Sequence, residues 1–95
     1  MELKIEQFEE IEKFWGNRMP MMAIEELSEL TQAISKCERH GIVAERKNLV
    51  DELGDVLISV MCIAKHYGID ESEIERRIED KTKKKYEKNS RVSSI

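Results

Sequence analysis

Four acidic residues occur as two pairs with the same spacing. Glu26 and Glu29 lie three residues apart in the phrase IEELSEL, and Glu52 and Asp55 lie three residues apart in VDELGDVL. On a helix, residues three apart share one face and are separated by one turn. Carboxylate oxygens are the ligands that Mg²⁺, Mn²⁺ and Ca²⁺ take, and no His or Cys accompanies them as zinc would require. The pattern therefore indicates a site for one or two hard divalent cations, with positions left open for water and phosphate oxygens.

Each pair lies on the shoulder of an apolar stripe. On a helical wheel of about 100° per residue, with the first acid of each pair at zero, the second acid falls at about −60°. The apolar residues fall between about 40° and 100° in both helices. Glu25 and Asp51 lie about 100° from the first acid of each pair, so we expect them to be bystanders. The stripes consist of Ala23, Leu27, Leu30 and Ile34 in the first helix and Leu49, Leu53, Val56 and Val60 in the second.

The two acidic phrases are equally far from a predicted turn at His40-Gly41. In an antiparallel helical hairpin, positions at equal distance from the turn lie level with one another. Residue 26 should therefore lie level with residue 55, and residue 29 with residue 52. The hairpin would bring four carboxylates into one patch if the two acidic shoulders face each other.

Such a patch needs compensation, because neighbouring carboxylates raise one another's pKa and burial adds to the effect. A divalent cation supplies it, but salt bridges to Lys36, Lys47 or the basic run at residues 81–88 would also do so. Two further alternatives weaken the cation hypothesis. A single Glu-x-x-Glu pair is typical of a solvated helix face, and any two amphipathic helices share a period.

The rest of the chain predicts an all-α fold with four helices. A charged fraction of 38%, an aromatic fraction of 5% and a single proline favour helices over short strands. Apolar periodicity and end signals place them at about 3–15, 19–39, 43–66 and 70–88. We therefore predict one helical domain over residues 1–88, followed by a flexible tail at 89–95.

Composition also limits the classes of partner and location. The net charge of −4 disfavours binding to nucleic acid or to an anionic membrane surface. No apolar run approaches the roughly 20 residues of a membrane span, and no signal peptide is recognisable. Cys37 and Cys62 lie in helical patterns without metal-ligand spacing, as in a reduced, cytoplasmic protein. A chain this short buries only a modest fraction of its surface, so self-association would stabilise it by burying more.

The acidic phrases resemble the signature of the all-α nucleoside triphosphate pyrophosphohydrolases, the MazG-like proteins and their relatives. The resemblance rests on Glu25-Glu26-x-x-Glu29, a gap of 22 residues, and Glu52-x-x-Asp55, and it includes the preceding Phe14-Trp15-Gly16. It spans most of the chain. Because the motif is shared across the whole superfamily, it is more specific for fold and metal chemistry than for substrate.

The resemblance implies a four-helix MazG-like bundle that assembles as a homodimer or homotetramer. It implies that Glu26, Glu29, Glu52 and Asp55 bind Mg²⁺, for which Mn²⁺ can substitute. The implied reaction cleaves a nucleoside triphosphate between the α and β phosphates, giving the monophosphate and pyrophosphate. The C-terminal run resembles a phosphate-binding segment of relatives, with its best matches at Lys85, Asn89 and Arg91, although the spacing to Arg91 is one residue short.

Chemistry adds two roles. A carboxylate beside a metal-bound water can act as general base, and either Glu29 or Glu52 could do so. Trp15 could stack on a nucleobase, although a tryptophan that ends an amphipathic helix also suits a core or an interface. Two alternatives to a broad (d)NTP pyrophosphohydrolase stay open: a narrower dCTP or dUTP pyrophosphatase, and a non-catalytic helical oligomerisation or adaptor module.

Overall fold

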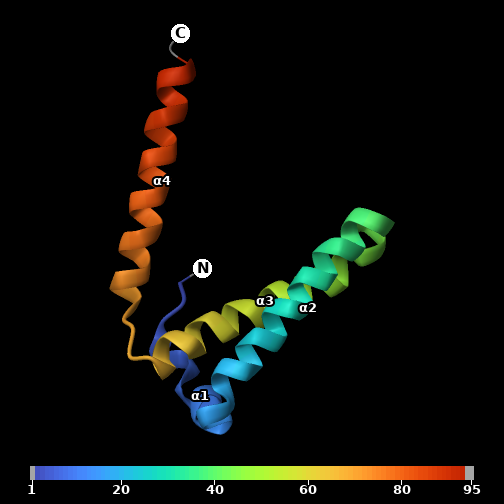
Figure 1. The fold of residues 1–95 in the computed structure, drawn as a ribbon, viewed down its shortest axis with the longest axis vertical. Coiled ribbons are helices and arrows are strands. Elements are labelled where there is room, and N and C mark those ends of the chain that lie inside the picture. The colour runs from blue at the N-terminus through green and yellow to red at the C-terminus, as the bar shows by residue number, and fades with distance from the viewer. Residues whose placement is uncertain (1, 94–95) are drawn as a thin grey trace.

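The computed structural model describes the backbone of residues 2–93 and the side chains of residues 2–83. Within that part every regular element is helical, which confirms the all-α prediction. Two short 3₁₀ helices, η1 and η2, flank α1, and three longer helices follow (Figure 1). The elements are η1 (Ile5–Phe8), α1 (Glu9–Trp15), η2 (Gly16–Arg18), α2 (Met19–His40), α3 (Ile42–His66) and α4 (Glu71–Ser93).

Helices α2 and α3 form an antiparallel hairpin that turns at Gly41, as the sequence predicts (Figure 1). Pro20 lies in the first turn of α2, where its missing N–H costs no helical hydrogen bond. Gly41 adopts φ 88° and ψ 151°, and its N–H donates to the carbonyl of Cys37. A positive φ strains any residue with a side chain, so glycine makes this tight reversal possible. The hairpin is the element that positions the acids.

The predicted first helix is not one α-helix. Residues 5–8 form a 3₁₀ turn, and α1 begins only at Glu9. In a 3₁₀ turn the side chains at positions i and i+3 eclipse, so Ile5 and Phe8 point the same way. Both contact the core cluster, where Ile5 is buried against Met61 and Ala64 of α3. Packing against α3 therefore overrides the α-helical period that the sequence predicts here.

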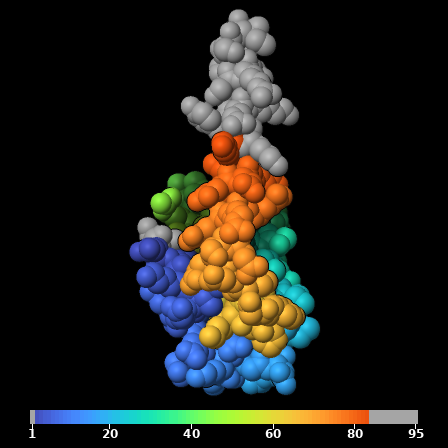
Figure 2. Space-filling model, turned by 90° about the vertical axis from the view of Figure 1, so that its left-hand side faces the viewer, coloured from blue at the N-terminus to red at the C-terminus, as the bar shows by residue number. Residues whose placement is uncertain are grey.

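Helix α4 diverges from the hairpin, so that the two make a V (Figure 1). Its first turn is held by Ile74, which packs against the core cluster, and by Glu73, whose carboxylate accepts the N–H of Asp70. Figure 2, viewed from the side on which α4 lies, shows α4 in front of the other elements and rising beyond them. α4 continues to Ser93, beyond the predicted end at residue 88. The domain boundary at 88 stays a prediction, and residues 94 and 95 lie outside the described part.

The chain is elongated. Its principal extents are 53 × 37 × 21 Å and its radius of gyration is 16.7 Å. A compact domain of this length has a radius of gyration of about 12 Å. Within residues 2–93, no helix combines the length and apolar character needed to cross a membrane.

Candidate metal centre

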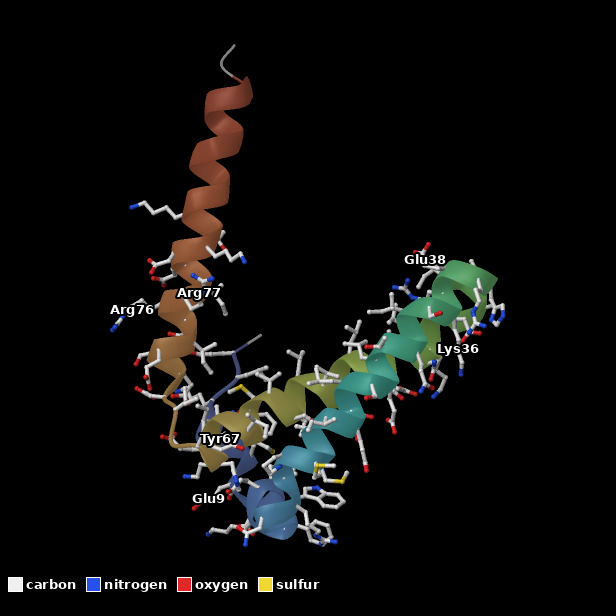
Figure 3. All side chains as sticks on the ribbon, in the orientation of Figure 1. Glu9, Lys36, Glu38, Tyr67, Arg76 and Arg77 are labelled. Carbon is white, nitrogen blue, oxygen red and sulfur yellow. The ribbon has the colours of Figure 1, made fainter. Side chains whose placement is uncertain are left out.

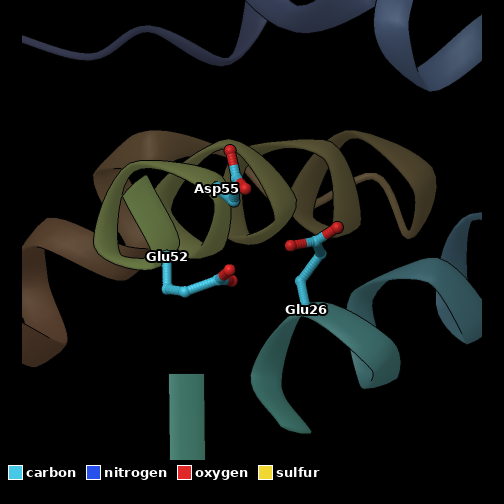
Figure 4. A group of neighbouring side chains, drawn as sticks. All are labelled: Glu26, Glu52 and Asp55. Carbon is cyan, nitrogen blue, oxygen red and sulfur yellow. The ribbon is translucent and has the colours of Figure 1, made fainter. Parts of the chain in front are cut away.

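The hairpin brings acids of the two phrases together. Glu26 projects from α2, and Glu52 and Asp55 project from α3 toward the same space (Figure 4). One carboxylate oxygen from each lies within 4.8 Å of the others. The predicted convergence about the turn is thus observed for these three residues.

Glu29, the fourth predicted acid, lies beside this group. It is exposed, and its carboxyl contacts that of Glu52 closely enough to raise the pKa of Glu52. It also acts on Glu26, whose pKa it raises. All four acids therefore occupy one patch. Glu26, Glu52 and the exposed Asp55 form an inner trio, defined by the convergence of their carboxylate oxygens, and Glu29 lies beside it at the rim.

Two carboxylate oxygens of the trio are isolated from solvent and from hydrogen-bond donors. They are the Oε2 atoms of Glu26 and Glu52. A buried carboxylate oxygen without a partner is costly, because it has lost its water and gained nothing. These are the only such side-chain atoms in the part of the chain whose side chains are described. The fold therefore leaves an uncompensated acceptor site where the two helices meet.

The electrostatics of the patch follow from the same arrangement. Burial raises the pKa of Glu26, and the charges of Glu29, Asp55 and Glu52 raise it further. Burial also raises the pKa of Glu52, and the charges of Glu29 and Asp55 raise it further. Both groups are consequently easier to protonate in the folded chain than in the unfolded chain.

The donor set fits a hard divalent cation. Oxygens on opposite sides of an ion with bonds of 2.0–2.6 Å lie about 4–5 Å apart, and the separations in the trio fall within that limit. Oxygen ligands alone, without His or Cys, suit Mg²⁺, Mn²⁺ or Ca²⁺ rather than zinc. A cation here would satisfy the two orphaned oxygens and offset the mutual repulsion of the acids.

The salt-bridge alternative finds no support among the described side chains. Of the two helix lysines considered, Lys47 pairs with Asp51 at 3.1 Å, and Lys36 forms no ion pair within the described set. No Lys, Arg or His side chain described in the structure forms an ion pair with any of the four acids. Asp51 and the exposed Glu25 thus lie outside the trio, as predicted for bystanders.

The predicted phosphate-binding residues cannot be placed at side-chain level. Lys85, Asn89 and Arg91 lie on the α4 backbone, but their side chains fall outside the described residues. Their role stays a prediction.

Trp15 is half-buried at the end of α1, and two neighbours that the sequence reading did not single out as site residues contact it. Phe14 meets it edge to face at 5.1 Å between ring centroids, and the guanidinium of Arg18 lies 5.4 Å from its ring centroid. Phe14 itself is 71% exposed. The adjacency of two aromatic residues and an arginine in FWGNR was the available signal. These residues form an aromatic and cationic surface, and stacking of a base on Trp15 stays a prediction.

Comparison with known proteins supports the resemblance of the acidic phrases. The sequence profile of the MazG-like family matches residues 20–94, which include both acid pairs and most of the chain. Searches of curated proteins and of solved structures gave no match. The family is of nucleotide pyrophosphohydrolase type and is hydrolase-related in general. On the strength of this match and the helical hairpin that carries its acids, the chain belongs to the MazG-like family.

Proposed function

We propose that this protein is a Mg²⁺-dependent nucleoside triphosphate pyrophosphohydrolase, in which Mn²⁺ can replace Mg²⁺. It converts (d)NTPs to the monophosphate and pyrophosphate. The observation that carries the proposal is the inner trio of Glu26, Glu52 and Asp55, with two oxygens buried and unpaired. Family membership supports the same class of chemistry.

The inner trio would hold the cation. When bound, a divalent ion neutralises phosphate charge and lowers the pKa of a water molecule. The role of this chain is to present three carboxylate oxygens from two helices at fixed separation. Glu26 and Glu52 are half-buried, and electrostatic interactions there are stronger than in water. The hairpin supplies that rigidity, because both helices run uninterrupted through the acidic phrases.

Glu29 is the group best placed to take a proton. It is exposed at the rim of the patch, outside the inner trio, while its carboxyl contacts Glu52. Of the two predicted general bases, Glu52 is already committed to the trio. We therefore assign Glu52 to cation binding and Glu29 to proton abstraction from the attacking water, with Glu29 available as a further ligand.

The substrate needs contacts beyond the cation. In this proposal Lys85, Asn89 and Arg91 contact the phosphates, as the family resemblance implies, and Trp15 with Arg18 offers a face for the base. The active form is a homodimer or homotetramer. A narrower dCTP or dUTP pyrophosphatase would use the same residues, with a base pocket that accepts one nucleotide.

The proposal is tested by pyrophosphate release from a panel of dNTPs in Mg²⁺ and in EDTA. We expect metal-dependent release that falls about 10²–10⁴-fold in Glu29→Gln, the range for loss of a general base. Glu25→Gln is the matched control, because Glu25 is an exposed acid on the same helix outside the trio. It should keep its activity.

The outcomes separate the alternatives. Release confined to dCTP or dUTP would favour the narrower enzyme. No metal-dependent release from any nucleotide would favour the non-catalytic module. If Glu29→Gln also lost cation binding, Glu29 would be a required ligand rather than the base.

A further inference from the structure

Two aromatic rings and a guanidinium gather where α1 meets α2. Trp15 ends α1, and the 3₁₀ helix η2 follows it over Gly16–Arg18. In a 3₁₀ helix side chains three residues apart eclipse, so Arg18 returns to Trp15, with its Cζ 5.4 Å from the ring centroid. Gly16 has a φ of 53°, a backbone conformation that strains any residue with a side chain. The local backbone therefore holds the guanidinium beside Trp15 and its neighbour Phe14.

The guanidinium of Arg18 has no acidic partner among the described side chains. It takes part in none of the ion pairs or side-chain hydrogen bonds of that part of the chain. An arginine side chain carries N–H donors and no acceptor. Its attraction to the ring of Trp15 uses the charge and leaves those donors available. Arg18 is exposed and Phe14 is 71% exposed, so the donors and the rings are open to a ligand.

This surface lies on the acidic side of the hairpin. Arg18 directly precedes α2 with helical backbone angles, φ −87° and ψ −4°, and on the wheel it falls at about −80°, close to Glu29 at about −60°. Glu26 lies eight positions farther along the chain, or about 12 Å along the helix axis. Figure 3 shows ring-bearing side chains at this end of the hairpin, on the side that faces away from α4, where oxygen-tipped side chains also project. A nucleotide whose phosphates lie at the acids can therefore place its base at Arg18.

We propose that Arg18 reads the edge of the base and that the protein prefers 6-oxopurine nucleotides, such as those of guanine and hypoxanthine. The inference rests on the proposed nucleotide chemistry and adds the class of base to it. A 6-oxopurine presents two acceptors side by side, O6 and N7, which together accept both arms of a guanidinium. Adenine carries an amino donor in place of O6, so donor would face donor. Cytosine presents an amino donor on the same edge, and thymine offers the single acceptor O4.

The aromatic neighbours favour a base over a phosphate as the partner of Arg18. A nucleobase has a flat face that stacks on an aromatic side chain, and it does so whatever its sequence identity. Trp15 and the exposed Phe14 supply such faces next to the guanidinium. A phosphate gains nothing from these rings. In the proposed site the phosphates are already held by the cation, about 12 Å along α2.

The test is kcat/KM for pyrophosphate release from dGTP, dITP and dATP in Mg²⁺. We expect dGTP and dITP to exceed dATP by about 5–150-fold, the discrimination of one good bidentate pair. In Arg18→Ala and Arg18→Lys this ratio should fall close to one, because neither side chain has the paired N–H donors of a guanidinium. Arg39→Ala is the matched control, since Arg39 is an exposed arginine in the last turn of α2. It should keep the wild-type ratio.

Two results from an active protein would overturn the inference. A wild type that favours dATP, or hydrolyses the three nucleotides alike, does not read a 6-oxopurine edge. If Arg18→Ala slows all three nucleotides by one factor, so that the ratio persists, Arg18 contacts a phosphate instead. Either result leaves the proposed pyrophosphohydrolase standing.

A chain that hydrolyses none of these nucleotides would refute the proposed function, and binding would then decide the inference about the base. Trp15 is the single tryptophan of the chain, so its fluorescence reports on this surface. We expect dGMP to quench it saturably and at least about fivefold more tightly than dAMP, with the difference lost in Arg18→Lys. Equal affinity for the two nucleotides, or no saturable quenching, would show that Arg18 does not select the base.

Discussion

Glu26 and Glu52 each direct one carboxylate oxygen into a space that neither solvent nor a donor reaches. Their pKa values are raised, because burial and neighbouring acids both penalise the charged form. A carboxyl whose pKa is higher in the folded state than in the unfolded state stabilises the fold when protonated. That contribution is complete below the unfolded pKa and is lost as the pH rises through the folded pKa.

The first prediction is therefore an inverted pH dependence in the absence of cations. In EDTA, the thermal midpoint should rise as the pH falls from about 8 toward the ordinary glutamate value of about 4.5. Divalent cation should flatten the profile by stabilising the charged state. Thermal melts at a series of pH values, with and without Mn²⁺, provide the measurement.

Glu52→Gln gives the control for this profile, since it removes one of the two raised groups. Its metal-free midpoint at neutral pH should exceed that of the wild type, and its pH profile should be flatter. A wild-type midpoint that falls steadily from pH 8 to about pH 5 in EDTA would contradict the account of the patch.

The sequence predicted the partners in this patch because helix geometry fixes angle and height from residue number alone. Two parallel spacings and one glycine turn were enough to bring Glu26 level with Asp55. The sequence could not predict that Glu29 lies at the rim of the acid patch. Rim and interior differ by a side-chain conformation and by local packing, which have no period in the sequence.

At the scale of elements, α2 and α3 agree with their predicted ranges to within one residue at each end. Their signals were local: a proline in the first turn, a glycine at the reversal and a sustained apolar stripe. The prediction of one α-helix at residues 3–15 was wrong, because Ile5 packs against residues more than fifty positions away. The spacing of apolar residues along a short segment carries no information about such distant contacts. The length of α4 was underestimated, since its apolar stripe fades before the helix ends.

Two glycines of the hairpin should respond to alanine in opposite directions. Gly41 has a φ of 88°, so Gly41→Ala forces a left-handed backbone and should cost about 1–2 kcal/mol. Gly54 is helical, and a methyl group there meets nothing within 4 Å. Gly54→Ala should therefore stabilise the chain by up to about 1 kcal/mol.

Urea unfolding of the two variants against the wild type measures both effects. A destabilising Gly54→Ala would contradict the expectation that this helical position has room for a methyl group.

At the scale of the whole molecule, the N-terminal segment ties distant parts together. The buried side chain of Ile5 contacts Met61 of α3. The backbone N–H of Ile5 donates a hydrogen bond to the carboxylate of Glu71 at the start of α4. Nearby, Cys62 is fully buried, with its thiol directed at the carbonyl of Phe8. Burial, together with the charge of Glu12, raises the pKa of that thiol, so it stays protonated and unreactive.

Ile5→Ala should weaken the packing of the N-terminal segment against α3 and the start of α4. We expect a loss of about 2–4 kcal/mol in the free energy of unfolding, from lost burial and a cavity. Labelling of Cys62 by a thiol reagent should accelerate in parallel, whereas Cys37, which is half-buried, reacts early in both proteins. Ile11→Ala is the matched control, because Ile11 is 38% exposed and should cost under about 1.5 kcal/mol. Equal effects at the two positions would argue against Ile5 as the anchor.

The V-shaped outline is the part of the fold least accessible from sequence. Apolar periodicity identifies which face of a helix is apolar and expected to be buried. It does not say whether the residues that pack on that face belong to the same chain. Leu53 belongs to a predicted stripe, yet in the single chain it is 45% exposed. Self-association was predicted from the chain length and from the family resemblance, and neither of these identifies the surface involved.

If the two acidic phrases together hold a divalent cation, the metal-free protein should bind Mn²⁺, and isothermal titration calorimetry measures that binding. We expect saturable binding that weakens by about tenfold or more in Glu26→Gln and in Glu52→Gln, since fewer charged ligands lower affinity. Binding should be unchanged in Glu25→Gln. Absent binding in the wild type, or equal binding in all four proteins, would contradict the claim.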